Sequence, residues 1–201
     1  MLIGLAVLVG YGQPPARSVQ QLRLSDCAPP CWIGIVPGDT STEEAVRRFS
    51  AIFAPVTNAP APPLTLGTAT NPWLVMPLLV SEDAAERLMV QFGSAEGVIN
   101  RIMIQGRRYG PVNTMPRLGD LVSLLGAPSC VNPQTPGFEG WTLYYHHANG
   151  TIQVGALGRN SLSWAQPVYF VYLRAAAEDA VVCSISQPWR GVYRSRYRES
   201  S

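Results

Sequence analysis

The stretch that decides the fold is Arg87-Leu88-Met89-Val90-Gln91-Phe92-Gly93, then Ser94-Ala95-Glu96-Gly97, then Val98-Ile99-Asn100-Arg101-Ile102-Met103-Ile104. Apolar and β-branched side chains dominate the two outer segments, and the middle segment contains a glycine, as hairpin turns often do. This pattern predicts two antiparallel strands joined by a four-residue turn.

A second hairpin is predicted further along the chain. Trp141 to His147 and Thr151 to Leu157 flank Ala148-Asn149-Gly150, and Asn-Gly is a strong signal for a tight hairpin turn. Val168 to Arg174 supplies one more apolar strand. Antiparallel sheet therefore dominates the second half of the chain.

The region between the first helix and the first hairpin is rich in proline. Residues 54–72 contain five prolines, which predicts a surface loop, and Trp73 to Val80 contains Pro77, which suits an edge strand. Residues 17–36 read as an extended lead that contains Cys27 and Cys31.

Two short helices are predicted. The first begins at Thr40-Ser41-Thr42-Glu43-Glu44, where Ser41 can cap the helix and Glu44 completes a capping box. Its apolar residues recur at helical spacing: Ala45, Val46, Phe49, Ile52 and Phe53.

The second helix is predicted from about Met115 to Leu125, with Thr114 as its cap, Pro116 in its first turn and Gly126 at its end. Its expected buried face consists of Leu118, Leu121, Val122 and Leu125.

These elements predict an α+β fold in which two short helices pack on an antiparallel sheet, within a domain that spans residues 37–186. Phe49 to Pro55 and Val122 to Pro128 both end a capped helix in Ala-Pro, and strands follow each of them. Two repeated helix-plus-sheet units, 37–110 and 111–186, would explain this similarity, and chance is the alternative.

The N-terminal segment predicts export. Residues 1–16 begin with an apolar run of signal-peptide length, too short to span a bilayer, and they are expected to be a signal peptide or a membrane anchor. A buried helix or strand is the third alternative. The segment could also associate peripherally with a membrane, so the expected location is extracytoplasmic, either secreted or associated with the cell envelope.

An even number of cysteines behind an export signal predicts disulfides. The favoured pairing is Cys27 with Cys31 and Cys130 with Cys183. Pro29-Pro30 disfavours an ordinary tight turn between the first pair, although a cis X–Pro bond would permit it. Otherwise Cys27 and Cys31 must bond to the two distant cysteines.

The net charge of the chain is only +2, which is too small to indicate that the protein binds nucleic acid. All fifteen basic residues are arginine. Codon bias in a GC-rich genome explains this, and selection for bidentate anion binding is the alternative.

No catalytic residue, metal site or cofactor is predicted. His146 and His147 are adjacent on a strand, so they point to opposite faces, and no nearby cysteine or carboxylate is expected to complete a ligand set. The bonded cysteines offer no nucleophile. A hydrolase would need a pair of carboxylates drawn from Glu82, Asp83, Glu86 and Asp120.

Two groups of residues suggest binding. Trp32, Trp73, Trp141 and Trp164 could form a carbohydrate platform, and burial in the core is the alternative. The basic aromatic tail, residues 187–201, could bind an anionic polymer or lipid headgroups, or it could be a solvated terminus. The candidate anion-binding residues in the tail are Trp189, Arg190, Tyr193, Arg194, Arg196 and Arg198.

The segment Pro30-Cys31-Trp32-Ile33-Gly34-Ile35-Val36-Pro37-Gly38-Asp39-Thr40 resembles the PCW-x-GI-x-PG-x-T opening of uncharacterised secreted bacterial proteins. Leu118-Gly119-Asp120-Leu121-Val122-Ser123-Leu124-Leu125-Gly126-Ala127-Pro128 is similar to their second helix. The order of helix and strands is more weakly similar to small envelope lipoprotein and β-lactamase-inhibitory-protein modules, which are interaction modules. No functional residue transfers to this chain from the resemblance.

The expected function is therefore an exported, non-enzymatic binding or structural module of the cell envelope, with an envelope protein or polysaccharide as its partner. An extracellular carboxylate-dependent hydrolase and an envelope polysaccharide-binding protein are the alternatives.

Overall fold

The computed structural model describes residues 15–53, 64–68, 71–79, 87–106, 115–132, 140–158, 162–176, 183 and 187–189. Within these residues the chain forms three helices, α2 (Arg17–Gln21), α3 (Thr42–Phe53) and α4 (Leu118–Leu125). It also forms one antiparallel sheet of nine strands. The fold is α+β, as predicted.

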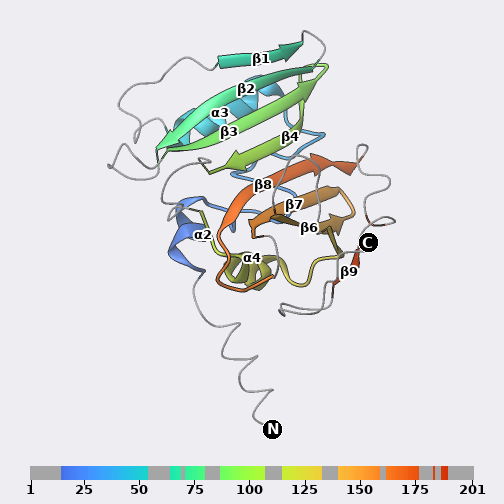
Figure 1. Cartoon of the computed structure of the whole chain (residues 1–201). Helices are drawn as coiled ribbons and strands as arrows, with labels where there is room; N and C mark the ends of the chain where they lie inside the picture. The colour runs from blue at the N-terminus through green and yellow to red at the C-terminus, as the bar shows by residue number, and fades with distance from the viewer. Residues whose placement is uncertain are drawn as a thin grey trace.

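The strands are β1 (Leu64–Thr68), β2 (Asn71–Leu79), β3 (Arg87–Ala95), β4 (Val98–Gln105), β5 (Cys130–Asn132), β6 (Gly140–His147), β7 (Gly150–Leu157), β8 (Val168–Ala175) and β9 (Gln187–Pro188). Their order across the sheet is β1-β2-β3-β4-β8-β7-β6-β5-β9. Figure 1 shows this order from β1 at one end, with α3 behind β2 and β3.

The sheet consists of two meanders that meet in its middle. α3 precedes the meander β1 to β4, and α4 precedes the meander β5 to β8. The last strands of the two meanders pair with each other, since Ile102 of β4 lies opposite Leu173 of β8. Apart from β9 at one edge, the strand order is therefore symmetric about the β4–β8 pair.

Ser41 caps α3 as predicted, whereas the Glu44 carboxylate, expected to complete a capping box, accepts hydrogen bonds from Arg47 and Arg48. The Ser41 hydroxyl accepts a hydrogen bond from the Glu44 amide at 3.2 Å. At the other end of the helix, Phe49 and Phe53 are buried and their rings pack against Trp32, with centroid distances of 6.1 and 5.8 Å. Trp32 therefore joins the N-terminal segment to this helix.

The predicted start of α4 is wrong. The helix begins at Leu118, and Arg117 rather than Thr114 is its N-cap; Thr114 lies outside the described residues. Residues before it are extended, because the Pro116 carbonyl accepts a hydrogen bond from the Val168 amide. Gly126 ends the helix with a φ of 81°, as predicted.

Two other segments differ from the sequence-based expectation. The extended lead contains α2, because Val19 and Leu22 are both buried in the core and hold this turn of helix in place. The proline-rich region expected as a loop contains β1, which makes β2 the second strand rather than the edge. β1 pairs only as far as Val75, so Pro77 lies beyond the paired stretch.

The first hairpin forms with a shorter turn than predicted. Ala95 lies opposite Val98, so the turn is Glu96-Gly97, and both residues have positive φ angles of 52° and 79°. Such a turn matches the twist of the two strands.

The N-terminal cysteines form a tight loop. Cys27 and Cys31 are bonded with their Cα atoms 5.6 Å apart, and the Pro29–Pro30 peptide is cis. The second disulfide joins Cys130 to Cys183. The structure therefore contains the favoured cysteine pairing. The two disulfides are compatible with an extracytoplasmic protein.

Candidate functional site

The two faces of the sheet differ sharply in chemistry. Alternate residues of a strand point to opposite faces. One face carries the strand residues of the hydrophobic core: Met76, Leu88, Val90, Phe92, Ile102, Ile104, Val131, Leu143, Ile152, Val154, Val171 and Leu173. Val19, Phe49 and Leu118 belong to the same core cluster, so α2, α3 and α4 pack on this face.

The opposite face is polar, aromatic and partly exposed. We name it the aromatic–arginine face. Its described members on β2, β3, β4, β7 and β8 are Trp73, Val75, Met89, Gln91, Arg101, Met103, Gln105, Gln153, Phe170, Tyr172 and Arg174. These residues are half-buried or exposed, whereas Gly93, Thr151 and Gly155 lie at positions of the same face and are buried. None of the nine strands contains Asp or Glu, so the strand positions of this face carry arginine charge alone.

Cross-strand register gathers the aromatic and charged groups. Trp73 lies opposite Gly93, Gly93 opposite Arg101, and Arg101 opposite Arg174, so four adjacent strands contribute to one row. In the next row Met103 lies opposite Tyr172. The register therefore places two guanidinium groups and two large rings within four adjacent strands, on β2, β4 and β8.

The absence of a side chain at Gly93 lets the side chain of Arg101 lie across β3 and reach Trp73. A Cβ built at Gly93 would lie 2.5 Å from Nε of Arg101, so a larger residue at this position would displace the Arg101 side chain from its observed position. Arg101 crosses the glycine and places its guanidinium carbon 4.4 Å from the ring centroid of Trp73. This distance is typical of a cation–π contact.

The two rings meet above the strands between them. The ring centroids of Trp73 and Tyr172 are 6.5 Å apart with an interplanar angle of 29°. Arg174 approaches the same tyrosine ring, with its guanidinium carbon 5.7 Å from the centroid. Trp73 and Tyr172, with Arg101 and Arg174, thus form one group of stacked and cationic side chains.

Gly155 of β7 plays a similar part for the ring of Phe170. A Cβ at Gly155 would collide with the ring of Phe170, which lies across it from the neighbouring strand. Like Arg101, this ring therefore lies along the sheet instead of standing away from it. The side chains of Arg101 and Phe170 therefore each cover a glycine of a neighbouring strand.

The four candidate tryptophans separate into different environments. Trp32 and Trp141 are buried in the core, at 0% and 3% exposure, so both are structural. Trp73 is on the aromatic–arginine face. Trp164 is 52% exposed beside α4, where its carbonyl accepts a hydrogen bond from Gly119. A platform of all four tryptophans does not exist.

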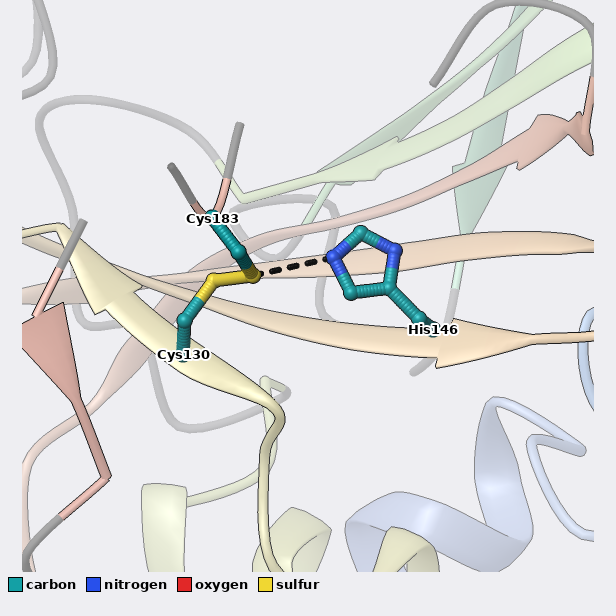
Figure 2. A group of neighbouring side chains, drawn as sticks. All are labelled: Cys130, His146 and Cys183. Atoms are coloured by element: carbon teal, nitrogen blue, oxygen red, sulfur yellow. Dashed lines mark hydrogen bonds between the residues drawn. A yellow bond between two sulfur atoms is a disulfide. The ribbon is translucent and has the colours of Figure 1, made fainter. Parts of the chain in front are cut away.

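A compact cluster of Cys130, Cys183 and His146 lies at the β5–β6 end of the sheet (Figure 2). Nε2 of His146 is 3.0 Å from Sγ of Cys183, and Nδ1 is 3.0 Å from Oγ1 of Thr151. The ligand atoms of the three residues lie within 4.8 Å of one another. The expectation that no cysteine lies near the histidines is therefore wrong.

The expectation that the histidines point to opposite faces is confirmed. His146 is exposed and faces the disulfide, whereas Nε2 of His147 is buried and has no hydrogen-bond partner among the described residues. Burial, reinforced by the neighbouring His146, lowers the pKa of His147. A single metal ion cannot bind both rings.

The candidate carboxylates give no catalytic pair among the described residues. Asp120 accepts a hydrogen bond from the Arg117 amide at 2.9 Å and caps α4. Glu82, Asp83 and Glu86 lie outside the described residues.

The beginning of the basic aromatic tail is anchored. β9 pairs with β5, and Trp189 packs partly buried against the core. The tail is therefore structured up to this residue. The remaining candidates of the tail lie outside the described residues: Arg190, Tyr193, Arg194, Arg196 and Arg198.

Sequence reasoning missed both the aromatic–arginine face and the cysteine–histidine cluster. One signal for the face was available, because Arg101, Met103 and Gln105 alternate with apolar residues in β4. The contact between His146 and Cys183 joins residues 37 positions apart and has no local signal.

Among the described residues, no helix is long and apolar enough to cross a membrane. Comparisons of the chain with protein-family models, with curated proteins and with solved structures found no match.

Proposed function

We propose that the protein is an exported, non-catalytic binding module of the cell envelope, and that its aromatic–arginine face binds an anionic polysaccharide. The observation that carries this proposal is the group formed by Trp73, Arg101, Tyr172 and Arg174. Two guanidinium groups lie within 4.4 and 5.7 Å of aromatic ring centroids on one partly exposed sheet face.

Each part of this group matches one part of such a ligand. Aromatic rings offer flat apolar surface for the faces of sugar rings, with a polar edge still available to water. Guanidinium groups pair with carboxylate or phosphate in a bidentate geometry. Aromatic surface combined with positive charge therefore favours a charged sugar chain over a neutral one.

The glutamines of the face support the same ligand class. Gln91 and Gln153 lie in the row of Met103 and Tyr172, and both are half-buried. An amide side chain provides two donors and one acceptor oxygen, which suits sugar hydroxyls. These groups would fix the orientation of a chain that stacks on the rings.

Export is supported by the two disulfides together with the N-terminal apolar run. The resemblance of the Pro30–Thr40 segment to secreted bacterial proteins, and the weaker similarity to envelope interaction modules, agree with this location. A polysaccharide of the envelope is then the anionic polymer that the face would encounter.

The hydrolase alternative has less support. Its candidate pair would need two carboxylates on facing elements, and Asp120 already caps a helix. No described strand contributes an acidic side chain to either face.

The proposal is tested by calorimetric titration of the protein with an oligogalacturonate and with a neutral dextran oligosaccharide of similar length. We expect binding of the anionic chain alone, with an affinity that falls as salt is added. Trp73→Ala and the double variant Arg101→Gln/Arg174→Gln should each weaken binding by about tenfold or more, or about 1.4 kcal/mol.

Two matched variants serve as controls. Trp164→Ala removes an exposed tryptophan outside the face, and Arg17→Gln removes one exposed arginine on α2. Both should bind as the unaltered protein does. Equal binding of the neutral chain would contradict the proposal. Binding only to an acidic envelope protein, lost in the face variants, would show that the face is a protein interface instead.

A further inference from the structure

We propose that the Cys130–Cys183 disulfide and His146 form a redox-gated metal site. A dithiol reduces the disulfide, and the two thiolates together with Nε2 of His146 then bind Zn²⁺. This inference is independent of the polysaccharide proposal, because it concerns different residues at the β5–β6 end of the sheet.

The positions of the ligands fit the cation. In tetrahedral zinc sites the Zn–S and Zn–N distances of about 2.3 and 2.0 Å place neighbouring ligand atoms about 3.5–3.8 Å apart. The two Sγ atoms and Nε2 already lie within 4.8 Å of one another. Once the sulfur–sulfur bond is broken, side-chain rotation alone can open the space that the ion needs.

The partners of His146 fix the orientation of its ring and allow the tautomer that binds a metal. Oγ1 of Thr151 lies 3.0 Å from Nδ1, and Thr151 is 2% exposed. In the oxidised chain Nε2–H donates to Sγ of Cys183 (Figure 2), because a disulfide sulfur can only accept, and Nδ1 then accepts from the Thr151 hydroxyl. After reduction the same hydroxyl can accept from Nδ1–H instead, which leaves the lone pair of Nε2 on the side of Cys183 for the metal. A hydrogen bond donated by the other ring nitrogen is the usual support of a metal-binding histidine.

The backbone around the site is fixed before any metal arrives. The Ser129 hydroxyl accepts a hydrogen bond from the His146 amide at 3.1 Å, and the Ser129 amide donates to the Tyr144 carbonyl at 2.7 Å. Cys130 lies opposite Tyr144 in the β5–β6 register. Two of the three ligands therefore belong to one hydrogen-bonded pair of strands.

Reduction and metal binding need only two reactants, a dithiol and Zn²⁺. The dithiol transfers two electrons and two protons to the disulfide, so that Cys130 and Cys183 become thiols and the dithiol becomes a cyclic disulfide. Zn²⁺ then displaces the two thiol protons and accepts the Nε2 lone pair. Cys₂His with one open position is a known zinc ligand set.

Exposure allows both reactants to enter. Cys183 is half-buried and His146 is exposed, whereas Cys130 is buried. The incoming thiolate therefore attacks Sγ of Cys183, and Cys130 leaves as the first free thiol. The oxidised protein offers one imidazole and no thiolate at this position, so it binds Zn²⁺ weakly.

The test measures Zn²⁺ affinity by competition with a chromophoric chelator, before and after reduction with a dithiol and its anaerobic removal. We expect one Zn²⁺ per reduced chain and at least about a hundredfold weaker binding by the oxidised chain. His146→Ala should weaken binding by the reduced chain at least about tenfold, and Thr151→Val by a smaller factor. Co²⁺ bound to the reduced chain should show thiolate-to-metal charge-transfer absorption.

Two controls separate this site from the rest of the chain. Cys27→Ser/Cys31→Ser removes the other reducible pair, and His147→Ala removes the neighbouring histidine on the opposite face; both should keep the full affinity. Circular dichroism of the reduced protein with and without Zn²⁺ verifies that it is folded. Loss of binding in the Cys27→Ser/Cys31→Ser variant, unchanged binding in His146→Ala, or no Zn²⁺ on the folded reduced chain would each overturn the proposal.

Discussion

The guanidinium group of Arg101 lies over the ring of Trp73, with its carbon 4.4 Å from the ring centroid, and it reaches that position by crossing Gly93. The contact joins β4 to β2 across an intervening strand. It depends on the absence of a side chain at Gly93, so this glycine controls the chemistry of the aromatic–arginine face.

Gly93→Ala should therefore displace Arg101 from Trp73. We expect the affinity for the oligogalacturonate to fall about tenfold, which corresponds to about 1.4 kcal/mol. The free energy of unfolding should change by less than about 1 kcal/mol, because the lost cation–π contact is offset by the lower entropy of the unfolded chain. Titration calorimetry and urea denaturation measure the two effects.

A double-mutant cycle checks that the effect acts through Arg101. In an Arg101→Ala background the added methyl group has nothing to displace, so Gly93→Ala should cause no further loss of affinity. Additive losses would show that position 93 acts in another way.

Glu44 should ionise at unusually low pH. Its carboxylate accepts hydrogen bonds from Arg47 at 2.6 and 2.7 Å and from Arg48 at 2.6 Å, which lowers its pKa from 4.5 to about 2. Because the folded-state pKa is the lower one, this stabilisation is present in full above about pH 4.5 and is lost as the pH falls towards 2. An NMR titration of the side-chain carboxyl carbon measures the pKa directly.

Variants test the same linkage through stability. Glu44→Gln should lower the free energy of unfolding near neutral pH, and the difference from the unaltered protein should shrink in acid. Glu43→Gln removes a charge from the same turn of α3 and controls for the helix dipole. A carboxyl titration midpoint near 4.5 for Glu44 would contradict the prediction.

Phe49 should be one of the most sensitive positions of the core. It is 4% exposed, and its ring lies 5.1, 5.9 and 6.1 Å from the rings of Phe53, Phe92 and Trp32. Phe49→Ala should lower the free energy of unfolding by about 3–5 kcal/mol, because it leaves a cavity between α3 and the sheet. Met89→Ala, at a position 41% exposed, should change it by about 0.5 kcal/mol or less, and urea denaturation compares the two. Equal losses would show that α3 does not pack as described.

The two disulfides should contribute unequally to stability. Cys130 and Cys183 are separated by 53 positions and Cys27 and Cys31 by 4. Loop-closure entropy assigns about 4 kcal/mol to the long loop and about 2 kcal/mol to the short one. Thermal denaturation of Cys130→Ser/Cys183→Ser and of Cys27→Ser/Cys31→Ser should show the larger loss for the first variant, and the reverse order would contradict this model.

Short stretches of sequence were enough to predict those elements whose formation depends on neighbouring residues. The alternating strands on both sides of Glu96-Gly97 and the Ser41 cap of α3 follow from short-range preferences, and both were predicted from the sequence. The cysteine pairing was favoured by count and compartment, and a cis bond at Pro29–Pro30 was the condition for it.

The elements that depend on distant partners could not be predicted in the same way. β1 is a strand because β2 pairs with it, although prolines on either side of it indicate a loop. α2 is a helix because Val19 and Leu22 reach the core. The aromatic–arginine face requires the register of β2, β3, β4 and β8, and no single segment contains that information.

The most direct test of the polysaccharide proposal uses the methionines as internal reporters. Met89 and Met103 belong to the aromatic–arginine face, whereas Met76 and Met115 are buried on the helix side, at 8% and 3% exposure. The measurement is a titration of ¹³C-methyl-methionine-labelled protein with the oligogalacturonate, followed by NMR. We expect the methyl signals of Met89 and Met103 to shift in a saturable manner while those of Met76 and Met115 stay in place. Saturable binding that leaves the signals of Met89 and Met103 unchanged would contradict the assignment of this face as the binding site.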